Sequence, residues 1–163
     1  MVNITLELAK SAKSVQEALD NLQISCQVVQ LSDSTRSAVE AADSIGCDIG
    51  QIVKSLIFKI KSSNQPVLIL ASGPNRVNEK AVESIITEAI GKADADFVRD
   101  ITGFAIGGIP PLGHKQKIEH IIIDEDLLKH EQIWAAAGTP NAVFNISSKD
   151  LVRVTKGKIA KIV

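Results

Sequence analysis

The stretch that most restricts the fold of this chain is VLILAS, residues 67–72, which is apolar on both faces of an extended backbone. Side chains of a strand point alternately to its two faces, so a strand with one solvated face alternates apolar and polar residues. VLILAS does not alternate. It therefore predicts a central strand of a sheet, buried on both faces.

The segments around this strand predict a mixture of strands and helices. Residues 4–22 carry apolar residues at steps of three and four, which indicates an amphipathic helix, and IVKSLIFKIK (52–61) alternates as a strand. Further strands are expected at 26–31, 118–124, 132–138 and 142–146, an edge strand near the C-terminus, and capped helices at 37–46, 78–89 and 147–155. Because strands and helices mix without strict alternation, we expect an α+β fold, a single domain over residues 1–163 with a mixed central sheet.

Composition narrows the class of protein. Of 163 residues, 45% are hydrophobic and only 3% aromatic, so the core must be aliphatic. The net charge of −1 argues against a broad nucleic-acid-binding surface. The first ten residues lack the basic and apolar regions of a signal peptide, and no apolar run reaches the roughly 18 residues of a membrane helix. We expect a cytoplasmic protein that does not enter a membrane.

A loop rich in glycine and proline, FAIGGIPPLGHK (104–115), is the first candidate for chemistry. Gly107 and Gly108 remove side chains where a backbone could approach a ligand, and the following proline pair fixes φ and removes two N–H donors. Gly113 permits a tight turn. Such a loop could hold an ammonium or carbonyl group, or stabilise an oxyanion, through its remaining backbone groups. A plain turn between strands explains these residues equally well.

The other chemistry-bearing residues give weaker signals. Lys54 lies inside an apolar strand, where a lysine either reaches solvent or enters a cleft, and the pattern alone favours solvent. His114 adjoins the glycine loop, but the spacing of the three histidines fits no common metal motif, so neither a metal nor a cofactor is expected. No nucleophile signature is present. The carboxylate pairs Asp94/Asp96 and Asp124/Asp126 are interpreted as turn and cap residues.

Taken together, four segments of the chain resemble the YbaK/ProX family of aminoacyl-tRNA editing domains, which is related to the insertion domain of bacterial prolyl-tRNA synthetases. The segments are STRSAVEAADSIGCDIGQIVKSLIFK (34–59), LILASGPNRVN (68–78), TGFAIGGIPPLGHK (102–115) and WAAAGTPNAVFNISSKDLVRVT (134–155). Gly108, Pro111 and Gly113 match the family's Gly-x-x-Pro-x-Gly loop. Gln51, Lys54, Ser55 and Leu56 match its Q-x-x-K-(S/T)-L strand.

The resemblance implies a fold, an activity and a set of residues. The fold is a mixed β-sheet curled toward a barrel, with surrounding helices and a cleft at one side. The activity is hydrolysis of the ester of a mischarged tRNA, in trans and without a metal, with the tRNA acceptor end and an aminoacyl-tRNA synthetase as partners. The catalytic residues it implies are Lys54, Gly108, Pro111 and Gly113. The candidate substrate-binding residues are Thr35, Arg36, Ser55, Gly107, Ile109, His114, Gly138 and Asn141.

One departure from the family and two alternatives stay open at this point. Cys-specific relatives have a polar Ser-Gly-Gly-Lys-Arg type of stretch where this chain has AGTPN (137–141), so the edited amino acid is not assigned. A non-catalytic module of the same fold could bind an aminoacyl group, a nucleotide or a synthetase. A hydrolase of small acyl esters would act without tRNA. The presence of Lys54 and of the whole glycine loop favours the deacylase.

Overall fold

The fold is built on one mixed β-sheet with helices on both faces. The computed structural model describes residues 2–3, 8–33 and 35–163, and within these ranges the sheet has nine strands in the order β1-β2-β8-β7-β3-β4-β6-β9, with β5 beside β3. The strands are β1 (Val2–Asn3), β2 (Val28–Leu31), β3 (Ile52–Ile60), β4 (Pro66–Ser72), β5 (Ile90–Lys92), β6 (His120–Asp124), β7 (Gln132–Ala136), β8 (Ala142–Ser147) and β9 (Lys158–Ala160). Parallel pairs join β3 to β7, β4 to β6 and β6 to β9, and the other pairs are antiparallel.

The helices agree with most of the expected segments. They are α1 (Lys10–Asn21), α2 (Ala38–Ile45), α3 (Glu79–Ile86), α4 (Ala95–Thr102) and α5 (Ser148–Thr155), with 3₁₀ turns η1 (Ile49–Gln51) and η2 (Glu125–Lys129). The first helix was expected from residue 4, but α1 begins at Lys10, and residues 4–7 lie outside the described part of the chain. The helix expected to reach residue 89 ends at Ile86, because Thr87 takes a left-handed conformation.

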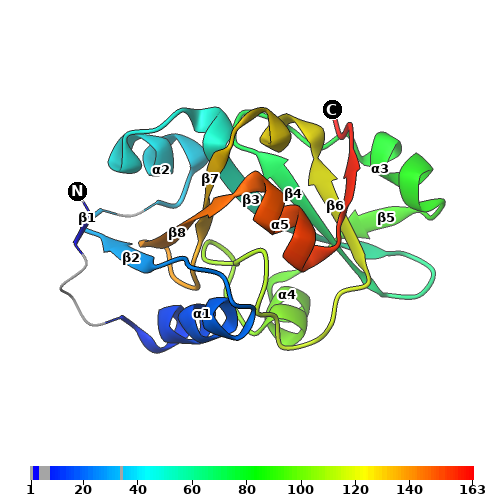
Figure 1. Cartoon of the computed structure of the whole chain (residues 1–163). Helices are drawn as coiled ribbons and strands as arrows, with labels where there is room; N and C mark the ends of the chain where they lie inside the picture. The colour runs from blue at the N-terminus through cyan, green and yellow to red at the C-terminus, as the bar shows by residue number, and fades with distance from the viewer. Residues whose placement is uncertain (1, 4–7, 34) are drawn as a thin grey trace.

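The predicted central strand is confirmed. β4 lies between β3 and β6, and its side chains enter two separate cores. Leu68 and Leu70 pack in the core that receives α1, α4 and α5, whereas Val67, Ile69 and Ala71 pack in the core under α3. Figure 1 shows α1 and α4 on the side of the sheet opposite to α2 and α3.

The sheet is open rather than closed into a barrel. Its path ends at β1 on one side and at β9 on the other, and the described residues of these two strands do not pair with each other. The sheet also divides at β3. On the edge away from β4, β3 pairs with β7 only at Ile52 and Val53, and with β5 only from Phe58 to Ile60.

Among the described residues, no helix is both long enough and apolar enough to cross a membrane.

Candidate functional site

The candidate site lies where β3 has no neighbouring strand. Ile60 donates its N–H to the carbonyl of Gln65 and accepts from the N–H of Asn64, both at 2.8 Å, so its backbone groups face the β4 hairpin. These directions alternate along an antiparallel strand, so the backbone N–H and C=O of Ser55 face away from β4. Ser55 lies between the residues that pair with β7 and those that pair with β5. Its backbone groups therefore face a gap in the sheet.

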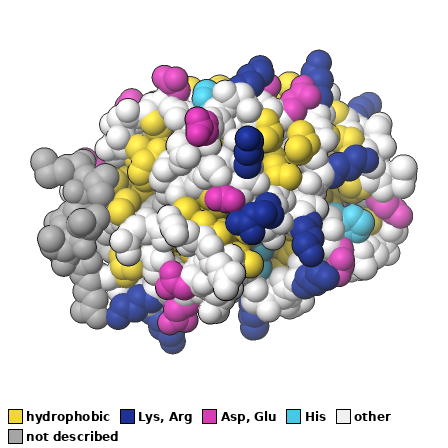
Figure 2. Space-filling view, viewed as in Figure 1, with side chains coloured by type: hydrophobic (Ala, Val, Ile, Leu, Met, Phe, Trp, Pro, Cys, Tyr) yellow, Lys and Arg dark blue, Asp and Glu magenta, His cyan; other side chains and the backbone are white. Residues whose placement is uncertain are grey.

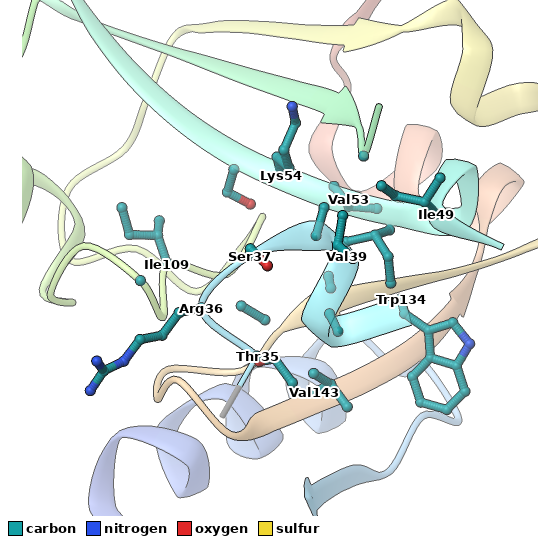
Figure 3. Close-up of a pocket in the computed structure, with 18 of the residues that line it drawn as sticks. Thr35, Arg36, Ser37, Val39, Ile49, Val53, Lys54, Ile109, Trp134 and Val143 are labelled. Carbon is teal, nitrogen blue, oxygen red and sulfur yellow. The ribbon is translucent and has the colours of Figure 1, made fainter. Parts of the chain in front are cut away.

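A cavity of about 510 Å³ opens at this gap, which is within the range of roughly 300–1,000 Å³ found for small-molecule sites. Its walls are mainly apolar, and Figure 3 shows residues from the segment before α2, from α2 itself, from β3 and from β7 and β8 around it. The described lining residues include two cations, Arg36 and Lys54, and no aspartate, glutamate, histidine or cysteine. The cavity is thus suited to an apolar group, and its two cationic residues can meet an anionic group at its edge.

Thr35, Arg36 and Ser37 form one wall, and backbone contacts hold them there. Thr35 donates both its N–H and its hydroxyl to the carbonyl of Pro140. Ser37 caps α2 by accepting the N–H of Glu40 at 3.1 Å, as the Ser-x-x-Glu spacing predicts. The Arg36 guanidinium extends outward on the side of Ile109 (Figure 3).

Only the part of the glycine–proline loop within residues 106–109 contributes to a second wall of the cavity. The N–H of Gly108 donates to the carbonyl of Ala105 at 3.2 Å and closes a β-turn, in which Gly107 takes a φ of +102°. A positive φ at the third position of a turn favours glycine. Gly107, Ile106 and Ile109 line the cavity, and Ile106 is 61% exposed.

The rest of the loop lies outside the cavity lining. A side chain at Gly108 would place its Cβ 2.8 Å from backbone atoms of Gly138 and Thr139, and Gly138 donates its N–H to the Gly108 carbonyl at 2.8 Å. Gly108 therefore lets the loop dock on the β7–β8 turn. Pro111 is buried, and a Cβ at Gly113 would lie 3.0 Å from Ala18 of α1. These positions hold the loop in place.

Three more of the expected residues also support the site from outside the cavity. Gly138 has a φ of +93° and packs against the backbone of Ser11. Asn141 accepts from the Thr139 hydroxyl at 3.1 Å and donates to the Leu31 carbonyl at 3.4 Å, which orders the same turn. His114 Nε2 lies 2.7 Å from the Pro110 carbonyl, and burial lowers the pKa of its imidazole.

Lys54 lines the cavity with its stem and is partly buried, which favours the cleft over the solvated face. In Figure 3 its ammonium points away from Ser37 and Ile109. The ammonium donates to the carbonyl of Asn75 at 2.5 Å. Burial lowers the pKa of Lys54 most, the Asp124 carboxylate raises it, and the charge of Arg76 lowers it.

Sequence reasoning missed the apolar rim of the cavity. Val39 of α2 is 55% exposed, and with Ile106 it is one of the exposed large hydrophobic residues of the described chain. Ile49 and the partly buried Trp134 complete this side. The available signal was Ile106, an apolar residue directly before a glycine pair, where a plain turn would be polar.

The comparison with known protein families agrees with this geometry. Residues 32–154 match the model of the aminoacyl-tRNA editing domain. This chain belongs to the aminoacyl-tRNA editing domain family. The match contains the whole cavity, from Thr35 to Val143.

The relatives of this editing domain include proteins that it matches over nearly their whole length and a synthetase that it matches over only a small part. The uncharacterized protein YwhH of Bacillus subtilis is 26% identical over 149 residues, which is 91% of this chain and 94% of YwhH. A crystal structure described as that of a candidate trans-editing enzyme for prolyl-tRNA synthetase is 40% identical, with a TM-score of 0.90 over 96% of this chain and 98% of that one. The proline–tRNA ligase of Thermodesulfovibrio yellowstonii is 30% identical over 71% of this chain, which spans only 20% of the ligase.

Proposed function

We propose that this editing domain hydrolyses the ester bond of a mischarged aminoacyl-tRNA, and that it acts in trans. The observation that supports this most is the cavity at the gap in the sheet, which carries two cationic residues and no acidic residue among its described lining residues. The 3′ end of an aminoacyl-tRNA joins phosphates to a small acyl group, and both parts fit such a lining. The family, and the full-length likeness to a candidate trans-editing enzyme, support the same substrate class.

The lining also fits a reaction without a protein nucleophile. Its described hydroxyl groups belong to Thr35, Ser37 and Ser55, and no histidine or carboxylate of the lining could activate them. An aminoacyl ester is already reactive, so water can add to its carbonyl carbon, with the neighbouring ribose hydroxyl helping to move the proton. The ester C–O bond then breaks, and the ribose oxygen leaves with the proton. The protein has to hold the ester correctly and stabilise the developing negative charge.

The proposed roles follow from where the groups lie. Within the described residues, the Lys54 ammonium makes one hydrogen bond, to the Asn75 carbonyl, and its other N–H groups could donate to a phosphate or to the developing oxyanion. Ser55 offers backbone groups that face the gap and a buried hydroxyl without a hydrogen-bond partner in the described structure. Groups of this kind are costly to leave unpaired, and a bound aminoacyl group would satisfy them.

Selection among amino acids would come from the fixed loop. The Gly108–Gly138 and His114–Pro110 contacts hold Gly107 and the following residues against the β7–β8 turn. A wall held in this way rejects a larger side chain by steric clash. Exclusion is needed because a pocket loses only about 1–3 kcal/mol for each missing methylene, which is too little to discriminate between similar amino acids by attraction alone.

Contact with tRNA should be limited to its acceptor end, and a synthetase is a proposed partner. The net charge is −1, and Figure 2 shows acidic and basic side chains interspersed over one face of the molecule. An extended RNA footprint normally needs a continuous basic surface. A synthetase that holds the rest of the tRNA would supply the missing contacts.

The test is a deacylation panel with Cys-, Ala-, Ser-, Thr- and Pro-tRNA. We expect hydrolysis of at least one mischarged species, and we expect Lys54→Ala to lower the rate about 100-fold, the usual effect of removing one transition-state donor. Lys61→Ala, an exposed lysine that follows the same strand and does not line the cavity, is the matched control. Equal rates for the wild type and Lys54→Ala would remove Lys54 from the mechanism.

Two other outcomes would replace the proposal. Folded protein that hydrolyses no species of the panel would favour the non-catalytic binding module of the same fold. Hydrolysis of free amino-acid esters with a kcat/KM comparable to that for aminoacyl-tRNA would favour an esterase that does not need tRNA.

A further inference from the structure

Near Lys54 lies a buried carboxylate, Asp124, that the proposed reaction does not use. Asp124 ends β6 and is only 1% exposed, and it makes no ion pair with the described residues. A buried charge is costly unless hydrogen bonds satisfy it. Asp124 accepts three: from the Ser72 N–H at 2.9 Å, from the Asn75 side-chain amide at 2.8 Å and from the Asp126 N–H at 3.0 Å.

These contacts connect Asp124 to Lys54 through the turn that follows β4. Ser72 and Asn75 begin and end this turn, and the Asn75 N–H donates to the Ser72 carbonyl at 2.9 Å. The Asn75 carbonyl receives the Lys54 ammonium, while the Asn75 side-chain amide donates to Asp124 and, at 2.7 Å, to Asp126. Asn75 thus binds the Lys54 ammonium through its backbone carbonyl, and the two aspartates hold Asn75 through its side-chain amide.

We propose that Asn75 and Asp124 are positioning residues that fix the Lys54 ammonium at the edge of the cavity. Asn75 supplies the carbonyl that receives the ammonium. Asp124 orients Asn75 and places a buried negative charge near Lys54. The inference rests on the proposed function, because it assigns to these two residues the placement of a cation that would act on the substrate.

A purely structural explanation is the alternative. Asp124 caps η2 through the N–H of Asp126, as its interpretation as a cap residue predicts, and it also ties β6 to the end of β4. Asp126 separates the two explanations. It contacts the same amide of Asn75, but it pairs with Lys129 at 2.9 Å, and the charges that shift the pKa of Lys54 are those of Asp124 and Arg76.

Other charges around this turn must be considered in any titration. Arg76, next to Asn75, lowers the pKa of Lys54, and Asp124 raises it. Lys129 and Lys161 act on Asp126 from η2 and from the chain after β9. Neutralising Asp124 leaves Arg76 as the charged neighbour that acts on Lys54, so the pKa of Lys54 should fall further below its usual value.

The experiment compares Asp124→Asn with Asp126→Asn in the full-length protein. The ionisation of Lys54 is followed by NMR of protein with isotope-labelled lysine, with the Lys54 signal assigned from Lys54→Arg. We expect Asp124→Asn to move the titration of Lys54 to lower pH and to lower kcat about 10- to 100-fold with little change in KM, the effect of a misplaced catalytic group. Asp126→Asn should leave the titration unchanged.

Either of two results with the aspartate variants would overturn the inference. One is an identical Lys54 titration in the wild type and in folded Asp124→Asn. The other is an equal loss of kcat in both aspartate variants, which would show that only the turn matters. If Asp124→Asn does not fold, Asn75→Ala, a change at a partly buried residue, provides the test: it keeps the carbonyl and removes the amide. An unchanged kcat in Asn75→Ala would also overturn the inference.

The NMR titration needs no substrate, so it separates this inference from the proposed function. A wild-type protein that is inactive across the panel contradicts the deacylase. A Lys54 signal that does not respond to Asp124→Asn contradicts the positioning pair, whatever the activity.

Discussion

Gly108→Ala tests whether the glycine–proline loop is held by close backbone contact. The new Cβ would lie 2.8 Å from the carbonyl carbon of Gly138 and from the nitrogen of Thr139, closer than real Cβ contacts. Both atoms are backbone, so no side-chain rotation relieves the clash. Overpacking costs about 1–3 kcal/mol, and loss of the Gly138–Gly108 hydrogen bond costs about 0.5–1.5 kcal/mol. We expect the free energy of unfolding to fall by about 2–4 kcal/mol.

Urea unfolding measures this loss directly. With a slope of about 2 kcal/mol per molar urea, the midpoint should fall by about 1–2 M. Gly46→Ala is the control for backbone strain, because Gly46 has a φ of +84° and no atom within 4 Å of an added Cβ. That variant should lose only about 1–2 kcal/mol. A Gly108→Ala midpoint equal to the wild-type value would falsify the docking argument.

Two further predictions concern the core and the pH dependence of stability. Leu70→Ala should lower the free energy of unfolding by about 2–5 kcal/mol, since Leu70 is fully buried in the central strand; a urea midpoint near the wild-type value would contradict that placement. Burial lowers the pKa of His114 in the folded protein, so its contribution to stability is present above the unfolded value of about 6.5 and is lost as the pH falls below it. His114→Gln should therefore lose less stability than the wild type between pH 7 and pH 5, and parallel curves would exclude this role.

Local sequence patterns predicted the parts of the fold that depend on neighbouring residues. The apolar run at 67–72 identified β4, because burial on both faces removes alternation. The spacing of Ser37 and Glu40 identified the start of α2, because a cap joins residues three apart. The short strand β5 (Ile90–Lys92) was not predicted, because a three-residue edge strand that contains a glycine has too little periodicity of its own.

The site depends on contacts between distant segments, which periodicity does not encode. β3 separates from β7 after Val53 pairs with Ala135, and nothing local to either strand specifies where that pairing stops. The same limit applies to Gly108. Its missing side chain suggested close approach to a ligand, whereas in the structure the neighbouring backbone of Gly138 occupies that side. The family resemblance placed Lys54 in the cleft, where its own strand pattern had favoured solvent.

The gap beside Ser55 also bears on how this sheet avoids aggregation. An unpaired strand edge normally invites another polypeptide to add to the sheet. Here β7 closes the gap at one end and β5 closes it at the other, so the open edge between Val53 and Phe58 is shorter than the five or six residues of a typical strand. The edge has room for one short extended group and too little for a neighbouring chain. Ligand access and protection against strand addition therefore come from the same interruption of the sheet.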